Sequence, residues 1–249
     1  MIDTHVHLND KAFNKNLNEI IQGALDNGIN KMIVIGYNYK SSLKAIEIAN
    51  KYPSCYAMVG LQPMDVDKES DKELNWIKEM IKKPKVVGIG EIGIDLYWTK
   101  ETKDLQIYFF KKQLEIAREN NLPVSIHARE ATEITYQILK NSNTRGVIHC
   151  YSGSLEMAKQ FTNLGYYLGI GGVLTFKNAK VKDVVKAIDL KYLVSETDAP
   201  YLAPFPHRGE MNKPEYIKII VNEIANLKDV TLKEAEMQID KNVKEMFGI

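Results

Sequence analysis

The chain contains 249 residues, with 33 basic and 32 acidic side chains that leave a formal net charge of +1. This balance excludes the strongly basic surface of a general nucleic-acid binder, so any nucleic-acid chemistry must rest on a local site. The two cysteines, Cys55 and Cys150, are too few for a disulfide framework and too far apart for a CxxC motif. With no signal-peptide pattern and no apolar run of membrane-spanning length, the sequence predicts a cytoplasmic protein without a membrane segment.

Short apolar runs rich in β-branched residues alternate with longer amphipathic segments, which is typical of strand–helix units around a parallel sheet. Eight strands are predicted, at residues 2–8, 31–37, 55–61, 85–95, 123–129, 146–152, 166–173 and 192–200. Helical segments fill the gaps, for example residues 102–121. Eight such units in a chain of this length predict a single-domain (β/α)8 TIM barrel over residues 1–249. The last segment, residues 231–248, opens with a capping box of Thr231 and Glu234, and we expect this helix to pack outside the barrel.

Unusual polar residues fall repeatedly where the predicted strands end, which is where barrel enzymes carry their chemistry. These residues are His5, His7, Glu91, Asp95, His127, His149 and Asp198. His5 and His7, in the opening stretch MIDTHVHL, are two residues apart, so an extended strand projects both from the same face. Histidine and carboxylate side chains are common ligands of divalent metals, and four histidines with two acids can hold two ions. Taken alone, His127 fits a hydrogen-bonding role equally well, so the prediction depends on the joint pattern.

Glu91 lies in the stretch GIGEIGID, where apolar residues and glycines surround a single carboxylate. A buried acid without a partner is costly, so Glu91 is predicted either to bind metal or to pair with a basic side chain. The glycines match GxGxxG, but the motif ends inside a strand and opens no helix, which argues against a dinucleotide site. We expect these glycines to allow a close approach of strands or substrate.

The stretches DTHVHL, GEIGIDLYW, HARE, HCYSG, SETDAPYLAP and PHRGEMNKP, in this order, resemble the TatD-type metal-dependent DNases, a branch of the amidohydrolase-like barrel enzymes. The resemblance implies a 3′ to 5′ exonuclease or DNase that depends on a divalent metal, often magnesium. It also implies that six residues are metal ligands, with Glu91 bridging two ions: His5, His7, Glu91, His127, His149 and Asp198. Imidazole ligands favour zinc or manganese instead, so magnesium, zinc and manganese all stay open.

One position departs from the family pattern. Members commonly show GLHP or GVHP after the third strand, whereas this chain reads GLQP, with Gln62 in place of histidine. Glutamine forms hydrogen bonds but cannot act as a cationic donor or a proton shuttle near neutral pH. We therefore expect altered substrate binding and unaltered metal binding.

A mechanism follows from the ligand chemistry. A metal-activated water would attack the phosphorus of a phosphodiester. Glu91 and Asp198 would be the catalytic carboxylates, and Asp198 would accept the proton. Glu196 is predicted to orient a ligand histidine, since such ligands usually need an outer partner. Four residues are candidate substrate contacts, namely Gln62, Arg129, His207 and Arg208. Five aromatic residues near strand ends could stack a terminal base, namely Tyr97, Trp98, Tyr151, Tyr201 and Phe205.

Two other functions compete with this interpretation. The same metal chemistry suits a hydrolase of carboxyl esters or amides, for example an aminoacyl-tRNA deacylase. A non-catalytic metal or nucleic-acid binding protein is disfavoured, because both Glu91 and Asp198 are present. The preferred partner is DNA with single-stranded ends, and neither a membrane nor a stable protein partner is predicted.

Overall fold

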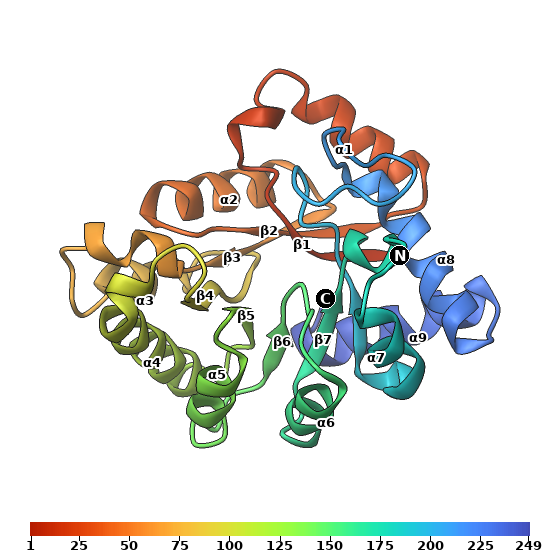
Figure 1. Cartoon of the computed structure of the whole chain (residues 1–249). Helices are drawn as coiled ribbons and strands as arrows, with labels where there is room; N and C mark the ends of the chain where they lie inside the picture. Colours follow the sequence, from red (N-terminus) through yellow and green to blue (C-terminus); the bar gives the residue numbers. More distant parts are fainter.

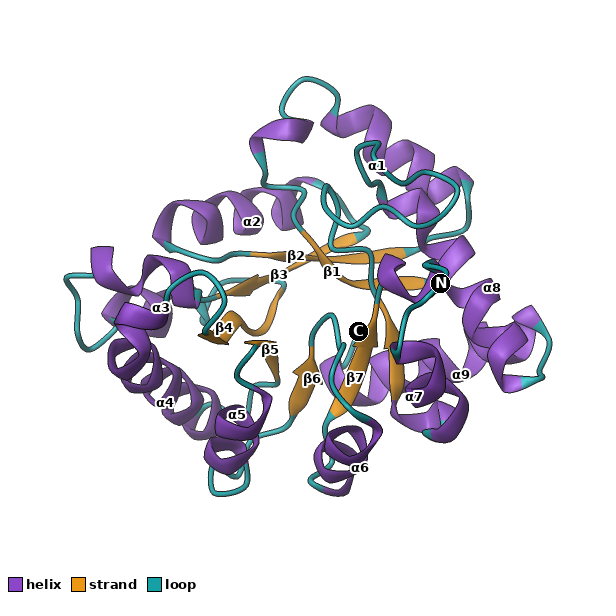
Figure 2. Ribbon diagram, in the orientation of Figure 1, coloured by secondary structure: helices purple, strands orange, loops and turns teal.

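The computed structural model describes residues 1–249, and its eight strands form one parallel sheet in the order β1 to β8, rolled into a nearly closed barrel. The strands are β1 Ile2–Val6, β2 Lys31–Ile35, β3 Cys55–Val59, β4 Val86–Asp95, β5 Val124–Arg129, β6 Gly146–Ile148, β7 Tyr167–Ile170 and β8 Leu193–Ser195. The helices are α1 Leu17–Asp26, α2 Tyr39–Lys51, α3 Asn75–Met80, α4 Lys103–Glu119, α5 Thr132–Leu139, α6 Leu155–Asn163, α7 Val181–Ala187, α8 Ile217–Lys228 and α9 Leu232–Phe247. They surround the strands (Figures 1 and 2), so the predicted (β/α)8 barrel is confirmed.

Apolar residues hold the helices against the barrel. Strand β2 is buried from Met32 to Ile35, as expected of a parallel strand covered on both faces. Helix α4 confirms the helix predicted at 102–121, although it begins one residue later and ends two residues earlier. It buries Phe109, Phe110 and Leu114. These side chains belong to a continuous cluster of 55 buried residues between strands and helices. The fold therefore has one main core, on which the strand ends are rigidly mounted.

All eight strands are shorter than predicted, and the carboxyl ends of β6 and β8 differ most from the prediction. Strand β6 ends at Ile148 and β8 ends at Ser195, so His149 and Asp198 lie after their strands and not within them. The backbone turns at these points, because Cys150 and Asp198 adopt left-handed conformations with φ of 47° and 57°. Such conformations end the alternation of a strand, and an apolar run in sequence does not reveal them.

The edges of the sheet meet at a seam between β1 and β8, where no strand ladder forms. Side chains close its lower part: the Thr4 hydroxyl donates to the Ser195 carbonyl, and the Ser195 hydroxyl donates to the Ile2 carbonyl, both at 3.1 Å. Two backbone hydrogen bonds close its upper part, from the Asp198 N–H to the His5 carbonyl at 2.9 Å and from the His7 N–H to the Ala199 carbonyl at 2.8 Å. The seam thus fixes the end of β1 directly against the segment after β8.

Helix α9 closes the other end of the barrel. Its capping box forms as predicted, with the Thr231 side chain accepting from the Glu234 N–H and the Glu234 side chain accepting from the Thr231 N–H. The last turn of α9 packs beneath the strands. Val243, Met246 and Phe247 cluster with residues of five strands, and Figure 1 places the C-terminus at the centre of the ring. None of the nine helices has the length and apolar character needed to cross a membrane.

Candidate metal centre

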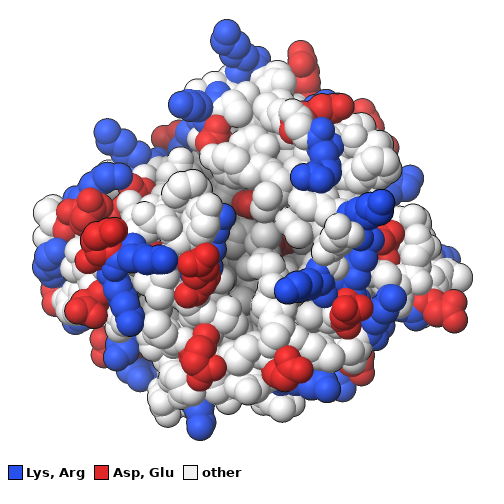
Figure 3. Space-filling model, viewed as in Figure 1, with Lys and Arg blue, Asp and Glu red and all other residues white.

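The strand ends surround a cavity of about 510 Å³ that contains most of the predicted ligands. His7, Glu91, His127, His149 and Asp198 line it, and His5 lies fully buried beside them. Figure 3 shows the hollow at the centre of the face, with acidic side chains visible in its depth. Five separate parts of the barrel thus bring their polar residues to one place, as the sequence pattern predicts.

His5, His7 and Asp198 form a group across the seam, called the seam cluster below. The two Nε2 atoms of His5 and His7 are 3.3 Å apart, and Asp198 Oδ1 lies 3.3 Å from His7 Nε2 and 3.8 Å from His5 Nε2. For metal–nitrogen distances of about 2.0–2.1 Å and a tetrahedral angle, two ligand nitrogens lie roughly 3.3 Å apart. These spacings match those of atoms that share one divalent cation.

Glu91, His127 and His149 form a second cluster. Glu91 Oε1 lies 2.9 Å from His127 Nδ1 and 4.0 Å from His149 Nε2. The other oxygen, Oε2, lies 3.9 Å from His5 Nε2 and 3.8 Å from His7 Nε2 in the seam cluster. Each carboxylate oxygen of Glu91 therefore faces a different cluster, which is the placement that a bridging ligand requires.

Each of the four histidines is held by its other ring nitrogen. His5 Nδ1 lies 3.0 Å from Ser125 Oγ, and His7 Nδ1 lies 3.2 Å from the Ile35 carbonyl. His127 Nε2 lies 2.9 Å from Asp95 Oδ2, and His149 Nδ1 lies 2.9 Å from Glu196 Oε1. A carbonyl or carboxylate can only accept, so the partners of His7, His127 and His149 keep a ring proton on the outer nitrogen and make the inner nitrogen the one that would bind a metal after losing its own proton.

The electrostatics of the site favour added positive charge. Burial lowers the pKa of His127, but its hydrogen bonds with Asp95 and Glu91 outweigh burial and raise the pKa to about 9. Burial also opposes protonation of His149, yet the charge and hydrogen bond of Glu196 raise its pKa to about 10. Burial would raise the pKa of Glu91, but His127 and the other histidines hold it well below its usual range. The donor set and this charge together fit a divalent metal.

Two glycines of β4 leave room for this arrangement, as predicted for the GxGxxG stretch. A Cβ at Gly90 would lie 2.7 Å from Ser125 Cβ, and one at Gly93 would collide with the His127 carbonyl oxygen. Gly93 also has φ of 140°, which side-chain-bearing residues rarely adopt. Glycine at these positions lets β4 and β5 approach closely enough for Glu91 and His127 to meet.

The other predicted site residues divide into two groups. Gln62 and Arg129 line the cavity, and Glu196 makes the contact to His149 that its predicted role requires. Arg208 and His207 lie outside the cavity lining. The Arg208 guanidinium lies 4.1 Å from the centre of the Phe176 ring, and His207 stacks on Tyr216 and contacts Glu210.

Three residues of the site have roles that the sequence does not predict. The sequence places Asp95 at a strand end but does not identify it as the partner of His127. Ser125 is two residues before His127 on the same strand, a spacing that could have indicated a shared face. Asp3 is fully buried and accepts from the Thr197 hydroxyl at 2.5 Å and from the Thr197 N–H at 3.0 Å, next to His5 and Asp198 of the seam cluster. Its partner is 194 residues away, so no local pattern reveals it.

Comparison with known proteins agrees with this geometry. A family model described as TatD related DNase matches residues 2–248. A Bacillus subtilis protein named uncharacterized metal-dependent hydrolase YabD is 40% identical, over 100% of this chain and 99% of that protein. The Methanocaldococcus jannaschii protein named uncharacterized metal-dependent hydrolase MJ1582 is 35% identical, over 99% and 96% of the two chains. The crystal structure of YJJV, a TatD homolog from Escherichia coli, has a TM-score of 0.96 at 30% identity and covers 100% of this chain and 98% of that one. The chain belongs to the TatD family of metal-dependent hydrolases.

Proposed function

We propose that this hydrolase is a deoxyribonuclease that uses two divalent metal ions to remove nucleotides from single-stranded 3′ ends, and that it acts in the cytoplasm. The position of Glu91 carries the proposal, because its two oxygens face two separate donor clusters in one cavity. The family description, TatD related DNase, supports the choice of DNA. Both cysteines are free thiols, which suits a reducing compartment.

The protein's own groups have defined tasks in this reaction. When bound, the metal ions would lower the pKa of water and neutralise charge on the phosphate. Glu91 would hold both ions, one at each carboxylate oxygen, and the outer partners of the histidines keep the ligand rings oriented. Asp198 is the more exposed of the two ligand carboxylates that line the cavity, at 13% against 8% for Glu91, and would accept the proton of the attacking water.

Exposed aromatic and apolar residues around the cavity suit a strand end. Trp98 is 61% exposed and Phe205 64% exposed, and Tyr97 and Tyr201 are also exposed. They come from the loops after β4 and β8, on the face that carries the cavity. Base stacking contributes about 1–3 kcal/mol per base without sequence preference. Of the five aromatic candidates, Tyr151 alone is unsuited, because it is buried and its hydroxyl donates to the Ser154 carbonyl.

A second hollow adjoins the cavity and suits the rest of the strand. It shares Tyr37 and Tyr201 with the cavity and is lined by Lys11, Lys40 and Lys44, none of which forms an ion pair. Its acidic residue, Asp10, is engaged by the Tyr201 hydroxyl and the Ala12 N–H. A cationic groove next to stacking side chains is the usual way to bind single strands.

The test compares metals and strand ends. Metal-stripped protein is incubated with 3′- and 5′-labelled single-stranded DNA after addition of magnesium, manganese or zinc. Asp198→Asn serves as control, since asparagine also tolerates the left-handed backbone at this position. Stepwise loss from the 3′ end that needs metal and disappears in the control supports the proposal. Intact DNA in the presence of metal-loaded protein refutes it and favours carboxyl esters, with aminoacyl-tRNA as the next substrate.

A further inference from the structure

Gln62, the residue that departs from the family pattern, is held in a fixed orientation. Its side-chain Nε2 donates to Asp65 Oδ2 at 2.9 Å. Asp65 is itself fixed, because it also accepts from Asn38 Nδ2 at 3.1 Å and from Lys68 Nζ at 2.7 Å. Asn38 in turn caps helix α2 through the Ser41 N–H. The network anchors Gln62 to the scaffold at the start of η2 (Pro63–Lys68).

The orientation of the amide follows from the charge of its partner. Burial would raise the pKa of Asp65, but the hydrogen bonds of Lys68, Gln62 and Asn38 hold it below its usual value. An ionised carboxylate only accepts hydrogen bonds, so the amide nitrogen of Gln62 must face it. The amide oxygen, Oε1, then points the other way and has no partner within the protein. Gln62 lines the metal cavity, and it therefore presents an acceptor to whatever enters.

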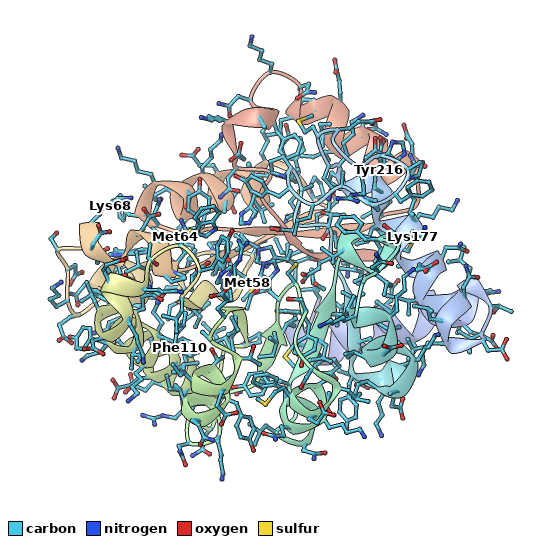
Figure 4. The ribbon with its side chains drawn as sticks, in the orientation of Figure 1. Met58, Met64, Lys68, Phe110, Lys177 and Tyr216 are labelled. Carbon is cyan, nitrogen blue, oxygen red and sulfur yellow. The ribbon has the colours of Figure 1, made fainter.

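Figure 4 shows the same element from the side of the cavity. Met64, which lines the cavity with Gln62, lies toward the centre of the molecule, whereas Lys68 lies at its outer edge. The Lys68 side chain is 71% exposed, so its charge is directed to solvent and not into the cavity. The wall formed by η2 thus offers an acceptor backed by a carboxylate, and no cationic group for a phosphate.

We propose that Gln62 Oε1 accepts a hydrogen bond from the terminal 3′-hydroxyl of the DNA strand, an inference that rests on the proposed nuclease function. A strand end offers two kinds of donor, the hydroxyl and the polar groups of the base. The bases differ in their donors, whereas every nucleotide carries the same hydroxyl, so a fixed acceptor in a sequence-tolerant site reads the hydroxyl. A cavity of about 510 Å³ is in the size range that encloses one small molecule. One nucleoside bound in it could therefore contact both Gln62 and the metal-ligand side chains.

The wall also selects against an alternative end. A 3′-phosphate would place its anionic oxygens against Oε1, which is itself an acceptor, while the one cation of this wall, Lys68, is directed to solvent and already paired with Asp65. Anionic oxygens held against an acceptor in a partly buried site, with no cation to contact them, are unfavourable. A 3′-deoxy end, which lacks the donor, leaves Oε1 unpaired and loses the net value of one hydrogen bond, a factor of about 2 to 10 in affinity. The order of preference is therefore hydroxyl, then hydrogen, then phosphate.

The test uses thymidine dinucleotides with 3′-hydroxyl, 3′-hydrogen or 3′-phosphate ends. Affinity for the metal-loaded protein is measured by calorimetry at calcium or zinc saturation, and cleavage is measured separately with magnesium or manganese. We expect the hydroxyl form to bind about 2- to 10-fold more tightly than the hydrogen form, and the phosphate form to bind at least on the order of 10-fold more weakly than the hydroxyl form. Equal affinity for all three ends overturns the inference.

Two variants connect the preference to this amide. Gln62→Met keeps the length of the side chain but removes the acceptor, so the ratio between hydroxyl and hydrogen ends falls toward one. Asp65→Asn releases the amide orientation and reduces the same ratio, with no change in metal content. Gln137→Met, the same substitution on the exposed face of α5, is the matched control and keeps the wild-type ratio. A ratio that survives in Gln62→Met overturns the inference even if the protein is fully active.

The binding and cleavage measurements test the acceptor role of Gln62 and the nuclease activity separately. A clear preference for the hydroxyl end without cleavage of any dinucleotide refutes the nuclease activity and retains the acceptor. Cleavage of all three ends at one rate, with equal affinities, refutes the acceptor and retains the nuclease activity.

Discussion

Asp95→Asn is expected to weaken metal binding at the second cluster through the proton position of one histidine. Asp95 Oδ1 accepts the N–H groups of Tyr97 and Trp98 at 2.9 and 2.8 Å, and Oδ2 lies 2.9 Å from His127 Nε2. In the variant the amide oxygen keeps the two N–H groups, so the NH2 group faces His127. His127 Nε2 must then accept, and the ring proton moves to Nδ1, the nitrogen that faces Glu91.

The magnitude follows from the loss of this outer partner. Removing the partner of a ligand histidine costs about 10- to 100-fold in metal affinity, or roughly 1.4–2.7 kcal/mol. Asp95 makes no hydrogen bond to the seam cluster, so the loss should be confined to one of two binding events. Titration of metal-stripped protein with zinc in competition with a chelator measures both affinities.

Asp71→Asn is the matched control for this substitution. Asp71 also accepts backbone N–H groups, those of Glu73 and Asn75, but it lies in an exposed turn away from the cavity. We expect wild-type metal binding in this control. Equal weakening of both metal sites in Asp95→Asn, or an unchanged His127 tautomer in nitrogen NMR spectra, would refute the reasoning.

Three further predictions concern pH, stacking and charge. Metal-stripped protein should lose stability between pH 6.5 and about 10. His127 and His149 have folded pKa values of about 9 and about 10, so they favour the folded state only while they are protonated. A melting temperature that rises over this pH range contradicts this prediction. Trp98→Ala should raise the KM for single-stranded oligonucleotides about 5- to 150-fold, the equivalent of one stacked base, and an unchanged KM in steady-state assays contradicts it. Replacing Lys11 and Lys40 by glutamine should reduce the slope of log affinity against log salt by about 1.4, as measured by fluorescence anisotropy, and an unchanged slope excludes phosphate contacts there.

The fold was predictable because its signal is local and repeated. Alternation of β-branched runs with amphipathic segments persists over the whole chain, and each unit carries the same information. Strand ends were less predictable, since the predicted strand 146–152 continues beyond Ile148 while the backbone turns at Cys150. This error did not affect the prediction that the polar residues lie together, because residues just after a strand lie on the same face of the barrel as residues at its carboxyl end.

Interactions between distant side chains set the limit of the sequence-based prediction. Arg208 is predicted from the sequence to contact substrate, but its guanidinium lies over Phe176, because the sequence cannot show how the loop after β8 folds. The residues that hydrogen-bond to the outer nitrogens of the ligand histidines could not be predicted from the sequence either. Asp95 is 32 residues from His127 and Ser125 is 120 residues from His5, so barrel closure, and no local spacing, brings them together.

Barrel closure and metal binding meet at the seam between β1 and β8. The seam cluster contains His5 and His7 from one side of the seam and Asp198 from the other, and each of the two backbone bonds across its upper part involves at least one of these residues. A cation shared by the three side chains would join the two edges of the sheet and stabilise the folded barrel, by an amount that rises with the logarithm of its concentration relative to its Kd. The second cluster lies on β4, β5 and the end of β6, which are already joined by strand ladders. Metal at either cluster would therefore stabilise the folded chain, but only metal at the seam would also connect two strands that no ladder joins.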